Sequence, residues 1–466
     1  MSRLSRSRLA PLLVLAAIGL TFGCSSTTTD TARPVVVFSD VHFNPFYDPN
    51  IFPSLLAADP DQWPAIFQGS TVTSLSAWGE DTNYLLFMQT LTSINQNLGA
   101  APLVIFTGDF LGHHFDTLFY SLYGSQDVAA MRAFSLKTVQ FFVAQVRLYC
   151  ENLPVMFVLG NNDEYEGDYL LAPNSPFLSD TAELFYSGLL LKTADQQTFL
   201  NTYKAGGYYV SQPLGNNMVV IALNTVFLTP DASGVAGIDG AIQTQLTWLE
   251  TTLASAKASG NKVWLLMHVP PGADEYKTAS SLDGGSQIAT AGMMMQATYQ
   301  ASLLQILSNY PGIITMSLAG HTHMDEYRNM LGDTASASEI VEITPSISPR
   351  SGNDPAFKII TFSNTTFEPA DYSSLNYDLS TLPAQFNSYY TFSTAYSMHG
   401  YMNADLTALV PELATASTKQ GFYRGSFYSG HDSASSITNS NWPVYWCGIG
   451  KMVQQNIVDC VNGYKQ

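Results

Sequence analysis

Short apolar runs alternate along the chain with longer segments in which apolar residues recur every three or four positions. The short runs are rich in Val, Ile and Leu, which is typical of strands buried on both faces of a sheet. The longer segments predict helices with one apolar face. We expect strands over residues 35–39, 103–107, 155–159, 218–223, 263–267, 313–319 and 339–343, and helices over residues 81–98, 128–149, 243–258 and 293–309.

This order of elements indicates an α/β fold with the helices on the outside of the sheets. Ligands of open α/β sheets bind at the carboxyl ends of the strands, and five predicted strands are followed there by Asp, His or Asn. Only eight His occur in the chain, and four of them follow these strands. Each residue alone could be a helix cap, a turn residue or a core histidine. Such separate roles do not explain why Asp, His or Asn follows five different strands. The candidates are Asp40, His42, Asp109, Asn161, His268, His321 and His323.

The residue types at these strand ends are those of a site for two metal ions. One carboxylate shared between two cations, with His and Asp on either side, is the chemistry of a dinuclear hydrolase that holds a phosphoryl group and activates water. Imidazole and carboxylate together suit Zn, Mn or Fe(II) better than Ca. We therefore expect two divalent metal ions, Zn first, with Mn and Fe as the alternatives.

The composition limits the class of partner. The chain has 466 residues, of which 46% are apolar and 12% charged, enough for one large domain or two smaller ones. It carries 37 acidic residues against 19 Lys and Arg. This argues against a nucleic-acid duplex as a partner, because a phosphate track needs clustered Lys and Arg. A phosphate substrate must therefore be attracted by something other than surface charge.

The N-terminus has the pattern of a targeting segment rather than of folded structure. Three Arg are followed by an apolar stretch over residues 9–22, which is short for a membrane span. With Gly23 and Cys24 next, residues 1–23 look like a lipoprotein signal peptide, with a lipid on Cys24 and residues 24–33 as a tether. Plain secretion is the alternative. In both cases we expect a protein that is secreted or held in the cell envelope, with the membrane as a partner only through that lipid.

Three cysteines remain after Cys24. In an oxidising compartment Cys447 and Cys460 are close enough in the chain to form a disulfide. Cys150 ends an apolar, helix-like run, so we expect a buried thiol. No Cys-x-x-Cys occurs, which argues against a zinc site built from thiolates.

In sequence order, the strand ends resemble the signature of the calcineurin-like metallophosphoesterases. The blocks are Asp40-Val41-His42, Gly108-Asp109, Gly160-Asn161-Asn162-Asp163, His268 and Gly320-His321-Thr322-His323. The segments MHVPPG (267–272), GHTHMDEY (320–327) and TPSISPRSGNDPAF (344–357) are similar to the acid sphingomyelinase-like phosphodiesterase branch, as is the C-terminal part with its late cysteine pair. The resemblance covers roughly residues 34–466, without a saposin domain.

The resemblance implies a four-layer α/β/β/α sandwich over residues 34–355 and a smaller, mainly helical C-terminal extension over residues 356–466. It also implies two metal sites joined by Asp109, and in-line attack on phosphorus by the hydroxide between the metals. One metal would be held by Asp40, His42 and His323, and the other by Asn161, His268 and His321.

Further positions concern the phosphate and the leaving group. His113 matches a family His that contacts phosphate or protonates the leaving oxygen, whereas for the adjacent His114 a catalytic role and an exposed loop position are equally favoured. Asn162 stands where most relatives have His, and an amide cannot donate a proton near neutral pH. A phosphoanhydride leaving group needs less protonation than an alkoxide. Nucleotide or polyphosphate anhydrides are therefore at least as well supported as lipid head groups.

We expect a phosphoesterase that cleaves phosphodiester or phosphoanhydride bonds. The alternative is a catalytically silent binding protein on the same fold at the cell surface. A competent residue at every ligand position argues against that alternative.

Overall fold

The computed structural model describes residues 32–464, apart from residues 284–286, 335–338, 382–384, 399, 402 and 432–436. The predicted signal peptide, Cys24 and residues 25–31 lie outside the described residues. In the part of the chain that is described, no helix has both the length and the apolar character that crossing a bilayer requires.

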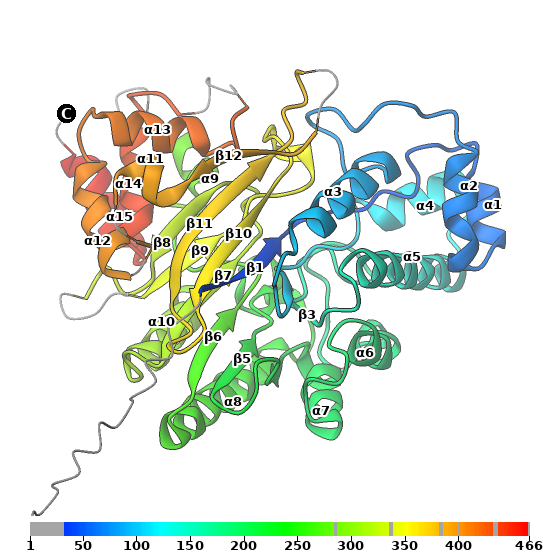
Figure 1. Ribbon diagram of the computed structural model, residues 1–466, viewed down its shortest axis with the longest axis horizontal. Helices are drawn as coiled ribbons and strands as arrows, with labels where there is room; N and C mark the ends of the chain where they lie inside the picture. Colours follow the sequence, from blue (N-terminus) through cyan, green and yellow to red (C-terminus); the bar gives the residue numbers. More distant parts are fainter. Residues whose placement is uncertain are drawn as a thin grey trace, which may run out of the picture.

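Two six-stranded sheets form the centre of the molecule (Figure 1). The first has the order β12-β11-β10-β1-β2-β3 and the second the order β4-β5-β6-β7-β9-β8. The strands of the first sheet are β1 (Ala32–Phe38), β2 (Val104–Phe106), β3 (Val155–Phe157), β10 (Ala356–Ser363), β11 (Pro369–Asn376) and β12 (Asn387–Thr391). Those of the second are β4 (Tyr209–Ser211), β5 (Met218–Ala222), β6 (Lys262–Leu266), β7 (Ile314–Ala319), β8 (Glu326–Asn329) and β9 (Ile340–Ile343).

Parallel pairing aligns the strand ends that matter for the site. In the first sheet β1, β2 and β3 are parallel, with Val36 opposite Val104 and Val104 opposite Val155. In the second sheet β5, β6 and β7 are parallel. The two sheets also contact each other face to face, since the ring of Trp264 on β6 meets that of Phe362 on β10 edge-on at 4.8 Å. Carboxyl ends of strands from both sheets can therefore meet at one edge.

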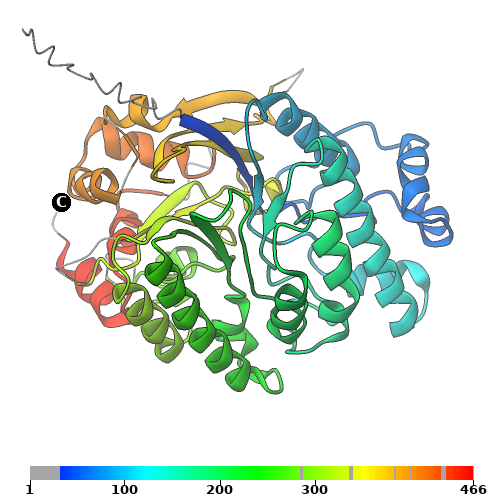
Figure 2. The same ribbon diagram turned by 60° about the horizontal axis from the view of Figure 1, so that its bottom comes forward.

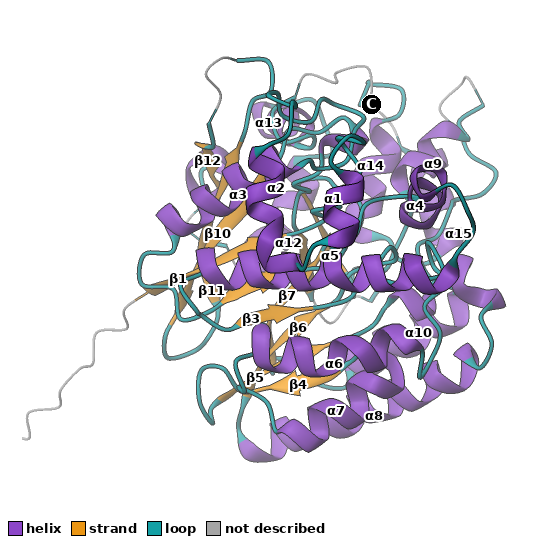
Figure 3. Cartoon of the chain, turned by 90° about the vertical axis from the view of Figure 1, so that its right-hand side faces the viewer, coloured by secondary structure: helices purple, strands orange, loops and turns teal. Residues whose placement is uncertain are grey.

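Helices cover the two sheets from outside, which confirms the predicted sandwich. Figure 3 shows α5, α6, α7 and α8 in front of the strands, and Figure 2 shows the C-terminal helices on the side opposite the N-terminal ones. The helices before β8 are α1 (Phe52–Ala57), α2 (Trp63–Gln68), α3 (Tyr84–Asn97), α4 (Phe115–Tyr123), α5 (Val128–Tyr149), α6 (Pro176–Gly188), α7 (Gln196–Gly206), α8 (Ile238–Ser259), α9 (Glu275–Ser280) and α10 (Ala297–Ser308). Short 3₁₀ turns are η1 (Pro60–Gln62), η2 (Val226–Leu228), η3 (Asp231–Gly234) and η4 (Pro349–Ser351).

All seven predicted strands and all four predicted helices are present, with shifted ends. The helix expected from residue 81 begins at Tyr84, because the Asn83 side chain accepts a hydrogen bond from the backbone N–H of Leu86 and caps it. The helix expected from residue 243 begins earlier, at Ile238, after Gly237 in the left-handed conformation.

The region after residue 355 was expected to be mainly helical, but it begins with strands. Strands β10, β11 and β12 lie within it, and β10 pairs antiparallel with β1, with Ile359 opposite Val36. The domain boundary at residue 356 stays a prediction, but the first sheet continues across it. The helices follow, as α11 (Phe392–Tyr396), α12 (Asn403–Glu412), α13 (Thr418–Ser426), α14 (Trp442–Gly450) and α15 (Gln454–Gly463).

Both cysteine predictions for the described chain are confirmed. Cys447 on α14 and Cys460 on α15 form a disulfide, with their Cα atoms 6.0 Å apart. Cys150 is a free, buried thiol, and burial raises its pKa to about 12. A thiol held in this neutral form is a poor nucleophile and a poor metal ligand.

Candidate metal centre

The candidate ligands predicted from the sequence lie at strand ends of the two sheets, and these strand ends come together in the structure. Asp40, Asp109 and Asn161 follow strands of the first sheet, and the four histidines come from the ends of β1, β6 and β7. Backbone hydrogen bonds join these loops: the N–H of Asp40 donates to Gly108 at 2.9 Å, and that of Gly320 to His268 at 3.0 Å. The N–H of Ser346, after β9, donates to the carbonyl of His323 at 3.1 Å. Six of the seven candidates are buried, and His321 is half-buried.

Five of the seven candidates hold the backbone in the left-handed region, which is uncommon for residues other than glycine. Their φ values are 48° for Asp40, 44° for His42, 62° for Asp109, 75° for His321 and 69° for His323. Backbone conformations of this kind cost free energy and cluster at functional sites. The loops are therefore shaped to present side chains to a common point.

Asp109 lies between two groups of donor atoms. Its Oδ2 is 3.3 Å from Nε2 of His42 and 3.3 Å from Nε2 of His268. The other oxygen accepts a hydrogen bond of 2.8 Å from the backbone N–H of Asn162. A single carboxylate oxygen thus faces imidazoles from both sheets.

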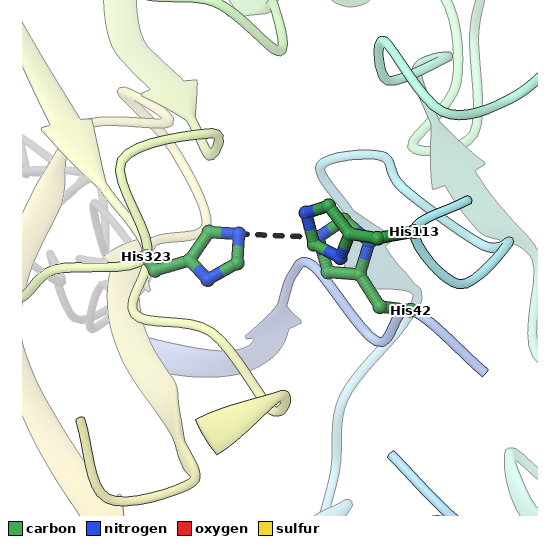
Figure 4. Close-up of side chains that lie close together, drawn as sticks. All are labelled: His42, His113 and His323. Carbon is green, nitrogen blue, oxygen red and sulfur yellow. Dashed lines mark hydrogen bonds between the residues drawn. The ribbon is translucent and has the colours of Figure 1, made fainter. Parts of the chain in front are cut away.

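The first group contains His42, His323 and Asp40. The Nε2 atoms of the two histidines are 3.1 Å apart (Figure 4), and Oδ1 of Asp40 is 3.5 Å from Nε2 of His323. Nδ1 of His42 lies 3.2 Å from the carbonyl oxygen of Leu111, which fixes the proton of the neutral ring on Nδ1. The lone pair on Nε2 therefore points toward the other donors.

The second group contains Asn161, His268 and His321. Oδ1 of Asn161 is 3.0 Å from Nε2 of His268 and 2.8 Å from Nδ1 of His321. Nδ1 of His268 is 2.7 Å from the carbonyl oxygen of Thr107, so in the neutral ring Nε2 carries the lone pair. The amide of Asn161 donates to Asp168 at 2.6 Å, which turns its oxygen toward the two histidines.

Both groups suit divalent cations, because imidazole nitrogens converge in each with a carboxylate or amide oxygen, the usual ligand atoms of such ions. Burial lowers the pKa of His42 and His323 well below 6.5 and that of His321 to about 3, so these rings are in the neutral form that binds metal. Burial raises the pKa of Asp109, but the interactions with His268 and then His42 outweigh this effect and hold the pKa well below 3.8. The carboxylate of Asp109 is therefore ionised without a metal ion.

The two remaining titrating groups are Asp40 and His268. Burial raises the pKa of Asp40 to about 7, against the charge of His268. Burial lowers the pKa of His268, but the charge of Asp109 and its hydrogen bond raise it to about 9. Both groups gain from a cation that replaces a proton, and metal binding at such a site releases protons.

His113 lies against the first group, and His114 does not. The His113 ring stacks on that of His42 at 4.0 Å (Figure 4). Its Nδ1 lies 2.8 Å from Oδ1 of Asp81. Burial lowers the pKa of His113, but Asp81 raises it above 6.5 overall. His114 is exposed, at the start of α4, and borders a small pocket beside Asn162. Of the two, only His113 directly contacts a candidate ligand.

Three acids behind the centre were not identified as contributors from the sequence. Asp81 orients His113, and Asp168 orients Asn161. Asp163 accepts backbone hydrogen bonds from Asp109 at 3.0 Å and from Gly160 at 2.7 Å, so it holds two of the loops together. Asp163 belongs to the quoted signature, which could have indicated it. Asp81 and Asp168 lie in loops without such a signal.

Asn162 and an adjoining cavity complete the site. The Asn162 amide donates to Oδ2 of Asp109 at 3.3 Å. A cavity of about 480 Å³ opens beside His321 and extends to Phe427, Tyr428 and Tyr445. The C-terminal extension therefore forms part of the wall next to the metal centre.

Comparisons with known proteins identify relatives of this chain. Over 97% of both chains, the sequence is 25% identical to the cyclic GMP-AMP phosphodiesterase SMPDL3A of Mus musculus. It is 24% identical to sphingomyelinase phosphodiesterase D of Dictyostelium discoideum over 78% of both chains. It is 22% identical to acid sphingomyelinase-like phosphodiesterase 3b of Homo sapiens, over 74% of this chain and 71% of that one.

A family model described as calcineurin-like phosphoesterase matches residues 33–325 of the 466. The match includes all seven candidate ligands together with His113 and Asn162. The chain therefore belongs to the calcineurin-like phosphoesterase family, in its acid sphingomyelinase-like branch, and is a metal-dependent phosphoric ester hydrolase.

Proposed function

We propose that this protein cleaves phosphodiester or phosphoanhydride bonds of small molecules or lipid head groups at two metal ions bridged by Asp109. The observation that carries the proposal is the position of Asp109 Oδ2, at 3.3 Å from His42 on one side and 3.3 Å from His268 on the other. A lone carboxylate oxygen between two imidazole groups suits a shared ligand of two cations.

Asp40, His42 and His323 would hold one ion, and Asn161, His268 and His321 the other. Zn fits this mixture of imidazole, carboxylate and amide oxygen, with Mn and Fe as alternatives. When bound, two such ions neutralise phosphate oxygens and lower the pKa of water enough for attack on phosphorus. They also give an acidic protein its local attraction for phosphate.

His113 would supply the proton to the leaving oxygen. One of its ring nitrogens lies within 4.8 Å of ligand atoms of both His42 and His323, so the ring reaches the centre. Asp81 holds Nδ1 at 2.8 Å and favours the protonated ring. Asn162 would donate a hydrogen bond to a phosphate oxygen, because its amide cannot transfer a proton.

The substrate is proposed from the site and from the relatives' names together. Those names specify cyclic GMP-AMP and sphingomyelin chemistry, both of which involve a phosphodiester. The aromatic wall formed by Phe427, Tyr428 and Tyr445 would accommodate a base or an apolar head group. We propose that the protein works outside the cytoplasm, secreted or attached to the envelope through a lipid on Cys24. The silent binding protein is not favoured, because every ligand position carries a competent donor.

Metal analysis and a substrate panel test this proposal. The purified protein should contain about two equivalents of metal by mass spectrometry. It should hydrolyse ATP, bis(4-nitrophenyl) phosphate or sphingomyelin, and a chelator should abolish the activity. His268→Gln should lose activity and one ion, whereas the control His431→Gln, outside the centre, should keep both. Full activity in the chelated protein, or no turnover of any substrate with Zn, Mn or Fe, would refute the proposal.

A further inference from the structure

Arg350 places a guanidinium group next to the metal centre. It lies on the turn η4 (Pro349–Ser351), and its neighbour Ser351 has its Oγ 3.1 Å from Nδ1 of His323. The Arg350 side chain is 36% exposed and lines the same cavity as His321. The turn is anchored by a hydrogen bond of 3.0 Å from the N–H of Gly79 to the carbonyl of Pro349. The backbone that carries Arg350 is therefore anchored, and its guanidinium is accessible from the cavity.

The hydrogen-bonding capacity of Arg350 is not used within the described protein. Its Nε is 4.0 Å from Oδ1 of Asp81, which is too long for a hydrogen bond. Asp81 already accepts the backbone N–H of His113 at 2.8 Å and faces its ring nitrogen at 2.8 Å. Among the described residues, no acceptor lies within hydrogen-bonding distance of the Arg350 guanidinium.

The other arginine of the cavity wall is not available in the same way. Arg328 is fully buried, with its Nη2 3.3 Å from Glu326, and it donates to the carbonyl of Pro271 at 3.0 Å. Of the described residues that line the cavity, Arg350 alone presents an exposed, fixed positive charge. A site that already holds two metal ions does not need this charge to bind a singly charged diester.

The position of Arg350 also identifies the side of the substrate that it faces. The same carboxylate oxygen, Oδ1 of Asp81, is 2.8 Å from the His113 ring and 4.0 Å from Arg350. Arg350 and His113 thus lie on the same side of the centre, next to Asp81, which is the leaving-group side if His113 acts as proposed. A guanidinium suits the paired oxygens of a phosphoryl group and repels a quaternary ammonium.

We propose that Arg350 binds a second phosphoryl group, attached to the one held by the metals, and so makes the protein selective for phosphoanhydrides. This inference rests on the proposed function and specifies its substrate class. In the reaction, water adds to one phosphorus, the P–O bond to the second phosphoryl group breaks, and its electron pair remains on the departing phosphate. Arg350 would stabilise the charge of that phosphate, and the water proton passes to solvent.

A binding experiment tests the role of Arg350 without turnover. Calorimetry on the metal-loaded protein compares imidodiphosphate, which resists hydrolysis, with orthophosphate, which lacks the second phosphoryl group. Arg350→Gln should weaken imidodiphosphate binding roughly 10- to 100-fold and orthophosphate binding less than about 3-fold. The affinity of Arg350→Lys for imidodiphosphate should lie between those of Arg350→Gln and wild type. Lysine keeps the positive charge but lacks the paired N–H donors of the guanidinium. Equal losses for both ligands, or no loss, would overturn the inference.

Kinetics separate this inference from the proposed function. In Arg350→Gln, kcat/KM should fall about 10- to 100-fold for ATP and less than about 3-fold for bis(4-nitrophenyl) phosphate. Arg147→Gln, which removes an exposed charge on α5, controls for net charge, and melting temperatures control for folding. A wild-type protein that hydrolyses neither substrate contradicts the proposed function. A wild-type protein that hydrolyses both, with the variant equally impaired on each, contradicts only the role of Arg350.

Discussion

Two polar clusters lie buried between the two sheets, and their charges are balanced in different ways. In one, Lys358 on β10 has its Nζ 2.7 Å from Asp325 and also pairs with Glu342 on β9. In the other, the carboxylate of Asp109 meets His42 and His268 from opposite sheets. Both clusters join the sheets, but only the first contains a permanent cation of its own.

The two clusters also differ in the backbone conformation of their residues. Lys358 and Glu342 occupy regular strands, and burial lowers the pKa of the lysine while Asp325 and Glu342 raise it more, so it stays charged. Asp109 and His42 occupy left-handed loop positions. In the cluster of Lys358 the chain supplies the counterion of its own buried acids, as expected of a cluster whose role is structural. A buried charge cluster indicates a cofactor site when the counterion must come from outside.

The largest expected effect is that of Asp109→Asn. The amide cannot bridge two cations, so we expect kcat/KM to fall on the order of 10³-fold and the metal content to drop below two ions. In the metal-free protein the change also removes the carboxylate that pairs with buried His268, so the unfolding free energy should fall there as well. Activity assays, metal analysis and chelator-treated melting curves check this. A variant that keeps both ions and half its activity would remove Asp109 from its bridging position.

Lys358→Met should reduce stability rather than metal binding. It leaves Asp325 and Glu342 buried without their cation, which costs about 3–5 kcal/mol of unfolding free energy. Metal affinity in the folded fraction should stay near that of wild type. Urea unfolding and metal titration measure the two quantities. Loss of metal without loss of stability would mean that the two clusters do not differ as described.

Asp168→Ala sharpens the description of the metal centre. Without Asp168 the amide of Asn161 loses the partner that orients its oxygen toward His268 and His321. Metal affinity should fall roughly 10- to 100-fold, as measured by competition with a chelating dye. Asp239→Ala, an exposed acid on α8, is the matched control and should leave the affinity unchanged. Equal affinities for the two variants would show that Asn161 is oriented by other contacts.

Glu339 shows a third way of balancing a buried acid, in which a proton neutralises the carboxylate. The expected effect of changing it is smaller. Burial raises its pKa to about 8, against the hydrogen bond from Ser317. Below about pH 4.5 both the folded and unfolded chains are protonated. Between that pH and 8 only the unfolded chain ionises, so stability falls as pH rises and this contribution is lost above 8. Glu339→Gln should reduce that fall by on the order of 2 kcal/mol in chelator-treated protein. Identical pH slopes in urea unfolding would contradict this.

Much of the centre was predictable because strand ends were recognisable from their apolar runs. The runs before Asp40, Asp109, His268 and His321 fix where the chain leaves a sheet, and parallel pairing then brings these ends together. The seven candidate ligands meet in the structure, while their roles as ligands remain a prediction. The disulfide between Cys447 and Cys460 followed from spacing and compartment.

The remaining features depend on contacts that carry no local signal. Asp81 and Asp168 act through side-chain hydrogen bonds across loops of irregular structure, so no period or motif identifies them. Strand β10 was not predicted, although its buried positions alternate in Ala356–Ser363, because the polar residues around it suggested an extension outside the sheet. Its pairing with β1 is set by tertiary contact between distant parts of the chain.

The left-handed backbone at five of the candidate ligands couples local strain to the donor atoms of the centre. Glycine would relieve the steric penalty at each of these positions, by roughly 1 kcal/mol or more. Glycine at Asp40, Asp109 or His321 would also remove the side chain that the loop presents. These loops therefore cannot be relaxed by glycine without dismantling the site.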